Sequence, residues 1–582
     1  MPDCPFNPAA ENIADLIYRF GSLQSERWNN TSSLCADYVS SDYIILHMPL
    51  TPDAVSMRVH PYYMIPSLFS PLDYNAMEAS GILSAFNSPA LNNQGKGVLI
   101  GLVDTGIDYR SPLFQNPDGT TRIAGIWDQS VPIEEDVLPA GVPDYYPMGG
   151  ASYGTEYTRE QINKALASDD PLSLVPTQDT IGHGTFLAGL AAGSSIPQED
   201  FTGAAPEAEL AVVKLKPAKK YLRDFYLIPS DAPAFQENDI MMGIKYLRMM
   251  ADRLKKPLVI LLAMGSNSGS HIGTSPLSQV TQNYSGFFGI ITVIAGGNET
   301  GAAHHFYASI PAGTEYEDVE IRVGKEEAER GFVLELWAAD ADTYTVGFIS
   351  PSGERISRIP IIANNETSIP FLLDATTITV NYQLIEAESG SQLIFMRFQT
   401  PAAGIWTVRV YNTQRFKGTF HMWLPVQGMI SEETVFLRPD PYSTITVPGN
   451  SRLPITVGAY DTSTGGIYIH SSRGFTPNQI VKPELAAPGV NILGPSVGRK
   501  PGSDTPMTTR TGTSAAAAIT AGAAANLLGW GIVEGNYPTM SEASVKSYLI
   551  RGAQRNPALT YPNREFGYGT LDLFQTFLRL RE

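Results

Sequence analysis

The sequence predicts an α/β protein in which a parallel sheet flanked by helices is interrupted by an inserted antiparallel β-sandwich. Continuous apolar runs alternate with helical patterns up to residue 303 and again after residue 440, as in a parallel sheet buried on both faces. Between them, short runs alternate apolar with polar residues and are separated by turn residues, which is typical of antiparallel strands. With 582 residues, the chain is also too long for a single core.

Four segments follow from these patterns. They are an N-terminal segment at 1–75, the first part of the α/β domain at 76–303, the sandwich (a jelly roll) at 304–440, and the second part of the α/β domain at 441–582.

Composition narrows the class of protein. The chain is 43% hydrophobic and 17% charged, with 52 Gly and 43 Pro, which suits a loop-rich globular protein. Its net charge of −18 argues against nucleic-acid binding, because that binding requires a basic face. No apolar run approaches the ~18 residues that a membrane span needs. The two cysteines, Cys4 and Cys35, exclude a disulfide framework and allow at most one bridge near the N-terminus.

The N-terminal segment carries three local patterns. Apolar residues at i, i+3, i+4 and i+7 from Ile13 predict an amphipathic helix over 13–20. An apolar run predicts a strand at 43–46, and the proline-punctuated residues 65–71 predict a linker.

The first part of the α/β domain contains two candidate catalytic residues. The run at 98–103 predicts a buried strand that ends at Asp104, and functional groups gather at the carboxyl ends of such strands. Taken alone, Asp104 is more simply explained as a turn residue. His183 lies in Gly-His-Gly-Thr at the start of an apolar helix, where its glycine neighbours allow close backbone approach. A single histidine at such a place is usually a polar cap.

The strand and helix pattern continues to residue 303. Strands are predicted at 210–213, 258–262 and 290–294, and helices at 158–167 and from an N-cap at Asp239. Gly265, Ser266 and Asn267 follow the second of these strands, and Asn298 follows the third in Gly-Gly-Asn.

The inserted residues predict a sandwich. Its strands are expected at 319–323, 332–337, 344–349, 378–382, 393–398, 405–411 and 420–424. Its aromatic residues, which are Trp337, Trp406, Trp423 and Tyr411, are expected to be core, with a saccharide platform as the alternative. A metal site has little support, because the adjacent pair His304–His305 lacks acidic or Cys partners at ligand spacing. We expect no cofactor, and structural calcium is not readable from the sequence.

Beyond residue 440 the α/β pattern resumes with a strand at 454–459 and leads to Thr-Gly-Thr-Ser at 511–514. An alanine-rich helix follows at once, so Ser514 lies in its first turn, where backbone N–H groups stabilise an anion. Ser514 is therefore either a helix N-cap or an acyl-transfer nucleophile.

Together, the motifs Val-Asp-Thr-Gly, Gly-His-Gly-Thr, Gly-Gly-Asn and Gly-Thr-Ser-Ala-Ala, in this order, resemble the subtilisin-like serine peptidases of family S8. The resemblance implies Ser514 as nucleophile, His183 as base and Asp104 as its orienting carboxylate. It implies Asn298 and the Ser514 N–H as the oxyanion hole. It further implies that Gly265, Ser266 and Asn267 pair with an extended peptide and line the first substrate pocket, with a purely structural loop as the alternative. The chain departs from the family pattern at Ala515 and Ala518, where Met and Pro are usual.

The position of the insert narrows the resemblance to one group within the family. A sandwich after Gly-Gly-Asn, together with the segments 154–158, 213–218 and 350–354, resembles the Csp germination proteases of clostridia and related gut Firmicutes. That group implies a protease that activates a spore cortex-lytic proenzyme, with a pseudoprotease acting in signalling or binding as the alternative. It implies a protein or peptide substrate and an N-terminal segment that serves as intramolecular inhibitor or chaperone, although 75 residues are few for a complete propeptide. No secretory signal is recognised at the start, so a cytoplasmic or spore-packaged location is expected.

Overall fold

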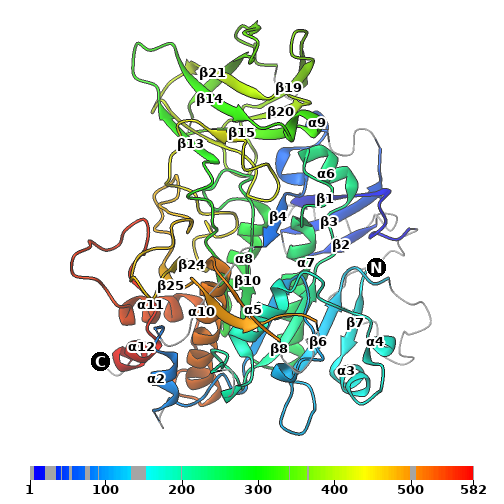
Figure 1. Ribbon diagram of the computed structural model, residues 1–582, viewed down its shortest axis with the longest axis vertical. Coiled ribbons are helices and arrows are strands. Elements are labelled where there is room, and N and C mark those ends of the chain that lie inside the picture. The colour runs from blue at the N-terminus through cyan, green and yellow to red at the C-terminus, as the bar shows by residue number, and fades with distance from the viewer. Residues whose placement is uncertain are drawn as a thin grey trace.

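A computed structural model of the chain describes residues 6–19, 35–40, 42–51, 56–71, 79–88, 91–132, 153–197, 200–339, 341–362, 366–498 and 506–580. Figure 1 shows an α/β unit below, two antiparallel sheets above it, and a small N-terminal sheet at the side between them.

An eight-stranded sheet with the order β25-β24-β12-β10-β5-β8-β6-β7 forms the centre of the α/β unit. Its neighbouring strands are parallel except for the pair β6 and β7. The strands are β5 (Leu99–Asp104), β6 (Ile123–Asp128), β7 (Thr155–Thr158), β8 (Glu209–Lys214), β10 (Leu258–Leu262), β12 (Ile290–Ala295), β24 (Ile455–Tyr460) and β25 (Leu485–Pro488). These parallel pairings confirm the parallel sheet predicted from the apolar runs. The strands of those runs are buried on both faces.

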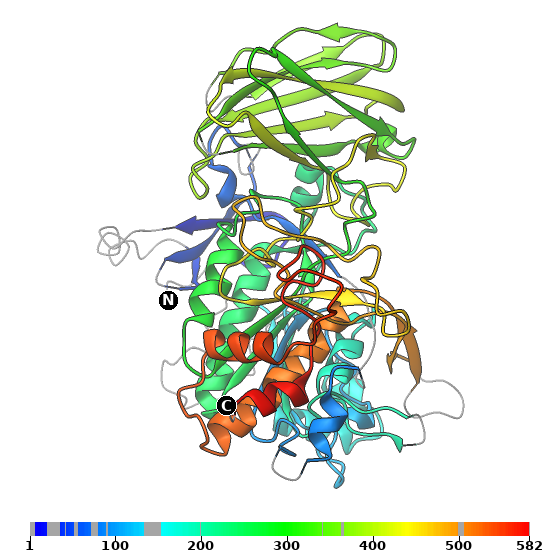
Figure 2. The same ribbon diagram turned by 90° about the vertical axis from the view of Figure 1, so that its left-hand side faces the viewer.

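Helices cover the two faces, as Figure 2 shows from the side. The helices of the α/β unit, not all of which lie on the sheet, are α2 (Ile82–Phe86), α3 (Arg159–Leu166), α4 (Pro171–Leu174), α5 (His183–Ala192), α6 (Lys220–Tyr226), α7 (Glu237–Leu254), α8 (Pro276–Ser285), α10 (Thr513–Leu528), α11 (Glu542–Gly552) and α12 (Leu573–Arg579). Helices α5 and α10 share one core with the sheet, and α7 and α8 share the other. Asp239 is not the N-cap of α7; Gln236 holds that position, and Asp239 binds Tyr153 from inside the first turn.

Helix α10 continues into a π-helical turn at Gly529–Val533. Within the described parts of the chain, this is the one helix whose length and hydropathy would suit a membrane span. Its most apolar stretch is 83% buried inside the protein, which is the environment of a core helix.

The N-terminal segment forms a three-stranded sheet of order β1-β3-β2. Its strands are β1 (Ile13–Arg19), β2 (Ala36–Tyr38) and β3 (Tyr43–Pro49). The helix predicted over 13–20 is wrong. Strand β1 is buried on both faces, with Ile17 in one core and Ala14 in another, so its apolar residues matched a helical spacing without forming a helix. Cys35 is disulfide-bonded, and Cys4 lies outside the described residues.

The predicted linker at 65–71 is also corrected. A short 3₁₀ helix at Tyr62–Met64 leads into strand β4 (Leu68–Pro71). This strand pairs antiparallel on one side with β11 (Met264–Gly265) and on the other with β9 (Phe235–Gln236). The segment is therefore part of a sheet on the α/β unit.

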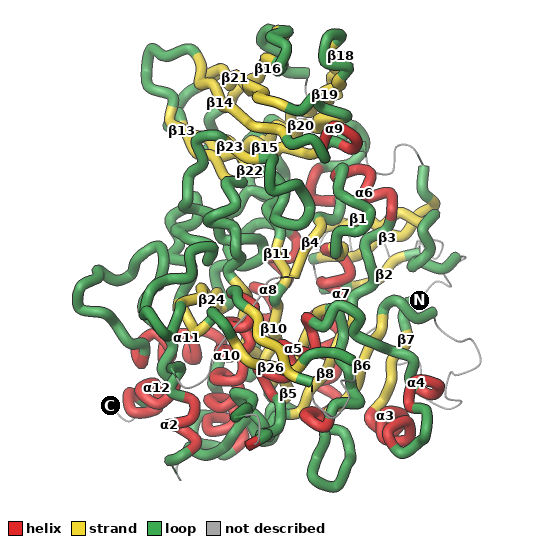
Figure 3. The backbone as a smooth tube through the Cα atoms, in the orientation of Figure 1, coloured by secondary structure: helices red, strands yellow, loops and turns green. Residues whose placement is uncertain are grey.

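Residues 305–436 form two antiparallel sheets around one shared core, which we call the sandwich. One sheet contains β13 (His305–Ser309), β22 (Thr419–Trp423), β15 (Phe332–Ala338), β20 (Leu393–Gln399), β19 (Thr376–Gln383) and β18 (Glu366–Phe371). The other contains β17 (Arg355–Ile356), β16 (Thr343–Ile349), β21 (Gly404–Gln414), β14 (Tyr316–Val323) and β23 (Val435–Phe436). Figure 3 shows how strand-rich this part is; its short helix is α9 (Glu327–Arg330).

A further cluster joins three parts of the chain. Tyr62 and Leu68 of the N-terminal segment, Phe225 of α6, and Trp337 and Phe395 of the sandwich belong to one buried apolar group. The sandwich and the N-terminal segment are thus packed together as well as against the α/β unit. One more hairpin, β26 (Ile492–Pro495) and β27 (Met507–Arg510), precedes α10.

Candidate active site

Asp104 and His183 meet at the carboxyl edge of the central sheet. Asp104 is the last residue of β5, and His183 is the first residue of α5. The His183 Nδ1 atom lies 2.8 Å from the Asp104 Oδ1 atom, and both side chains are buried. Because the carboxylate accepts a hydrogen bond from Nδ1–H, the Nε2 atom is the ring nitrogen that can accept a proton.

A second set of hydrogen bonds fixes this pair. Asp179 accepts hydrogen bonds from the Thr105 hydroxyl at 2.9 Å and from the Thr185 N–H at 2.9 Å. The Gly184 N–H donates to the Thr105 hydroxyl at 3.0 Å. A Cβ atom on Gly184 would lie 2.2 Å from the carbonyl oxygen of Gly106, so only glycine lets the helix start come this close to the turn after β5.

Ser514 is the second residue of α10, which packs against α5. The N-cap is Gly512, so Ser514 does not occupy the capping position. Its Oγ atom is buried and has no hydrogen-bond partner among the described residues. The capping explanation of Ser514 therefore fails. Its hydroxyl is buried in the first turn of α10 and forms no hydrogen bond with His183 in this structure.

Asn298 is tied to the same helix start. Its Oδ1 atom accepts the Thr513 N–H at 3.1 Å, and the Gly297 N–H donates to the Thr513 hydroxyl at 3.1 Å. With the amide oxygen used in this way, the Nδ2 group is the half of the side chain that can donate to a ligand. Asn298 and Ser514 are thus linked through Thr513.

In the segment Gly265, Ser266 and Asn267, the first two residues pair with neighbouring backbone and the third points its side chain into the protein. Gly265 pairs with Ser70 of β4, and Ser266 forms a bridge with Val447. The Asn267 side chain turns into the protein and donates to Glu299 at 3.0 Å. Gly265 is therefore the member of the three that lies beside an extended peptide segment.

Two features of this edge were not predicted from the sequence. Strand β9 flanks β4 opposite β11, so β4 is held from both sides. Glu237, directly after β9, accepts the Ser67 N–H at 3.1 Å and donates its own N–H to the Ser67 carbonyl at 2.9 Å. Burial raises the pKa of Glu237 to about 7. A two-residue strand leaves no periodic signal in a sequence, which is why β9 was missed.

A metal centre has no support in the described residues, which hold no group of three or more His, Cys, Asp or Glu side chains placed to bind an ion.

Comparison with known proteins identifies the family and the fold. The sequence profile of the subtilase family (peptidase S8) matches residues 95–349 and 438–569. The structure of the Clostridium perfringens CspB protease superimposes with a TM-score of 0.75 and 30% sequence identity, covering 88% of this chain and 98% of that one. The gap between the matched ranges falls within the sandwich.

Plant relatives are more distant. The subtilisin-like proteases SBT3.12 and SBT1.9 of Arabidopsis thaliana are each 24% identical, over 81% of this chain. The chain spans 59% and 62% of their lengths. The family profile covers most of the chain, including the three motifs around Asp104, His183 and Ser514. The chain therefore belongs to the subtilase family.

Proposed function

We propose that this protein is a serine endopeptidase in which Asp104, His183 and Ser514 form the catalytic triad. The observation that carries the proposal is the buried carboxylate–imidazole bond of 2.8 Å between residues 79 positions apart, each at the end of its own strand or helix. Such a pair fixes the tautomer of a histidine that acts as a base.

The proposed reaction uses these three side chains in turn. His183 Nε2 takes the proton of Ser514 as Oγ attacks the substrate carbonyl carbon, and Asp104 stabilises the resulting imidazolium. The N–H of Ser514 and the Nδ2 group of Asn298 donate to the oxyanion. The imidazolium then protonates the leaving amine as the C–N bond breaks. Water, deprotonated by His183, hydrolyses the acyl-enzyme and restores the serine.

The substrate is proposed to be an extended peptide that adds a strand between β11 and β9. The N-terminal segment, through β4, occupies this position in the structure. A substrate can therefore bind only when β4 leaves, which supports a role of the segment as intramolecular inhibitor. Its extensive packing against the α/β unit and the sandwich supports a role as folding chaperone.

The finer proposal is a Csp-type role, in which the protein activates a spore cortex-lytic proenzyme by cleavage. It is supported by the 30% identity and the nearly complete overlap with CspB. A pseudoprotease is not favoured, because the catalytic residue types of the family stand at all four positions.

Fluorophosphonate labelling tests the proposal. The intact protein is labelled before and after limited proteolysis of the N-terminal segment, and the modified residue is mapped. We expect the label on Ser514, faster after proteolysis, and none at that position in Ser514→Ala. Peptidase turnover of Ser514→Ala should fall by about 10⁶-fold.

The exposed Ser463→Ala serves as the control and should behave like the wild type. Persistent turnover in Ser514→Ala would disprove the nucleophile. A folded protein that accepts no label in either state would identify a pseudoprotease.

A further inference from the structure

A cavity of about 720 Å³ lies between the sandwich and the α/β unit, lined by neither His183 nor Ser514. Its floor is the outer face of β13, β22 and β15. In these strands the alternate residues Phe306, Phe420 and Leu334 point into the core of the sandwich, so the residues between them face outward. Loops of the α/β unit, which include Ser270 and Asn478, also line the cavity.

A row of neighbouring rings lines the cavity. The rings of Tyr307 and His421 have centroids 4.8 Å apart and are tilted by 43° to each other, whereas those of His421 and Trp423 lie 5.2 Å apart and stack at an angle of 8°. His271, from the α/β unit, stacks on Trp423 at 4.1 Å and continues the row across the boundary. Tyr307 is 42% exposed and Tyr442, also in the lining, is 37% exposed, so two rings of the cavity offer surface to a ligand.

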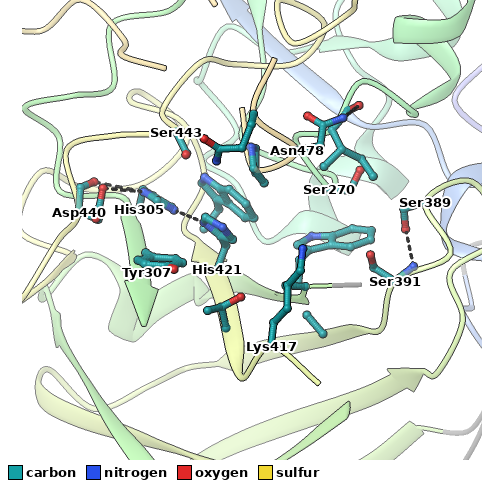
Figure 4. Close-up of a pocket in the computed structure, with 18 of the residues that line it drawn as sticks. Ser270, His305, Tyr307, Ser389, Ser391, Lys417, His421, Asp440, Ser443 and Asn478 are labelled. Atoms are coloured by element: carbon teal, nitrogen blue, oxygen red, sulfur yellow. Dashed lines mark hydrogen bonds and ion pairs between the residues drawn. The ribbon is translucent and has the colours of Figure 1, made fainter. Parts of the chain in front are cut away.

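Burial keeps the two imidazoles of the lining neutral, and their hydrogen bonds set which nitrogen carries the proton. His305 donates from Nδ1 to the carbonyl oxygen of Asp440 at 3.2 Å, so its Nε2 atom accepts from His421 Nδ1 at 2.9 Å (Figure 4). The Nε2 atom of His421 is left as an acceptor. Burial lowers the pKa of His421 to about 3 and that of His305 well below its usual value. The indole N–H of Trp423 is a buried donor without a partner among the described residues.

Short neutral polar side chains and small apolar residues form much of the rest of the lining. Figure 4 shows Ser270, Ser443 and Asn478 on one side of the cavity and Ser389 and Ser391 on another. The charged members of the lining, Lys417, Arg564 and Asp440, are of mixed sign.

This chemistry selects the class of ligand. A lipid would leave the hydroxyl and amide groups unpaired. A strongly anionic ligand would bury its charge beside the Asp440 carboxylate as well as beside Lys417 and Arg564, so the lining is not a site of one sign. A sugar ring has an apolar face that packs on flat rings, and hydroxyl groups that both donate and accept hydrogen bonds. The cavity volume lies within the range of small-molecule sites. We propose that this cavity binds a neutral saccharide of two or three sugar units, independently of the catalytic centre.

The test is titration of the full-length protein with cellobiose, maltose and N,N′-diacetylchitobiose, followed by calorimetry and by tryptophan fluorescence. We expect saturable binding of at least one of them, accompanied by a fluorescence change from Trp423 and Trp337 in the cavity wall. Tyr307→Ala should weaken that binding by about tenfold, because the exposed ring is lost.

Tyr316→Ala is the matched control. Tyr316 is 38% exposed, lies on β14 in the other sheet and contacts Arg409, so its loss should leave binding unchanged. Ser514→Ala should also bind normally, which separates this proposal from the proposed peptidase activity. The proposal is overturned if no saccharide binds, or if Tyr307→Ala binds as tightly as Tyr316→Ala.

Discussion

The Thr446 side chain fills the space between the backbone at Gly265 and the backbone at Gly297, which border the proposed first substrate pocket. A Cβ atom on Gly265 would lie 2.5 Å from the Thr446 Oγ1 atom, and one on Gly297 would lie 2.6 Å from its Cγ2 atom. The Thr446 N–H donates to the Gly296 carbonyl at 3.0 Å, and the residue is fully buried. The side chain is therefore wedged between the strand that pairs with a peptide and the loop that carries Asn298.

We predict from this position that the peptidase prefers a small residue before the scissile bond. Thr446→Gly should raise kcat/KM for peptides with Leu or Phe there by about 10–200-fold, and change it little for Ala. The measurement is kcat/KM over a peptide series that differs only at this residue. The neighbouring Thr444→Gly is the comparison variant, because Thr444 binds Arg473 and Thr300 instead. An unchanged preference in Thr446→Gly would show that the pocket lies elsewhere.

Asn298→Asp tests the donor role of the Asn298 side chain separately from its acceptor role. The carboxylate keeps the acceptor for the Thr513 N–H but removes the Nδ2 donor. We expect kcat to fall by at least about 10²–10³-fold, with KM little changed, because the donor acts on the oxyanion of the transition state. Thermal unfolding of the variant checks that the helix start is intact. Full activity of a folded Asn298→Asp variant would contradict the oxyanion assignment.

The site residues that the sequence predicts share a feature of their local sequence. Asp104, His183, Asn298 and Ser514 lie in short motifs whose glycines are sterically required, as Gly184 illustrates through its contact with Gly106. Thr446 and the inward turn of Asn267 toward Glu299 carry no such local signature. Their roles depend on which loops the fold brings together, so only the structure reveals them.

At the scale of elements, strands were predicted correctly where every residue of the strand is buried in the same apolar surroundings. The central strands are buried on both faces and stand out as continuous apolar runs. Strand β1 has the same double burial but includes Asp15, which is also buried and pairs with Lys219 at 2.8 Å. The polar residue broke the apolar run and made a helical spacing the better match. Strand β4 was missed because it is four residues long and lies in a proline-punctuated stretch, which is typical of a linker.

Lys219 anchors the N-terminal segment to the α/β unit. Besides Asp15, its Nζ atom binds the carbonyl oxygens of Pro8 at 2.6 Å and Ile13 at 3.0 Å, and the side chain is buried. Lys219→Met should loosen the segment, because the buried Asp15 keeps only His47 as a basic partner among the described residues and the two carbonyl oxygens lose their donor. We expect faster proteolytic loss of the segment and faster fluorophosphonate labelling.

Lys220→Met is the matched control for that prediction. The Lys220 side chain is 78% exposed and pairs with Asp224 at the surface, where such pairs contribute little. Equal rates of proteolysis and labelling in the two variants would show that the segment does not limit access to the site.

At the scale of the whole molecule, buried carboxyl groups couple stability to pH. Glu542, at the start of α11, accepts the Thr292 N–H at 2.6 Å from the central sheet, and its Oε1 atom has no hydrogen-bond partner among the described residues. Burial raises the pKa of Glu542 from 4.5 to about 8, although Lys546 opposes the shift. Glu237, beside the N-terminal segment, has its pKa raised to about 7 by the same cause.

The direction of the pH effect follows from these values. Between pH 4.5 and about 8 the folded protein keeps the Glu542 proton that the unfolded chain releases. The contribution of Glu542 to the free energy of unfolding is therefore fully present below the unfolded pKa of 4.5. It is lost as the pH rises through the folded pKa of about 8. Glu542→Gln is neutral at every pH, so its free energy of unfolding should decline less between about pH 5 and about pH 8, by on the order of 3 kcal/mol. Chemical denaturation at a series of pH values measures this difference. The exposed Glu326→Gln should keep the wild-type slope, and an equal slope in both variants would show that Glu542 ionises normally in the fold.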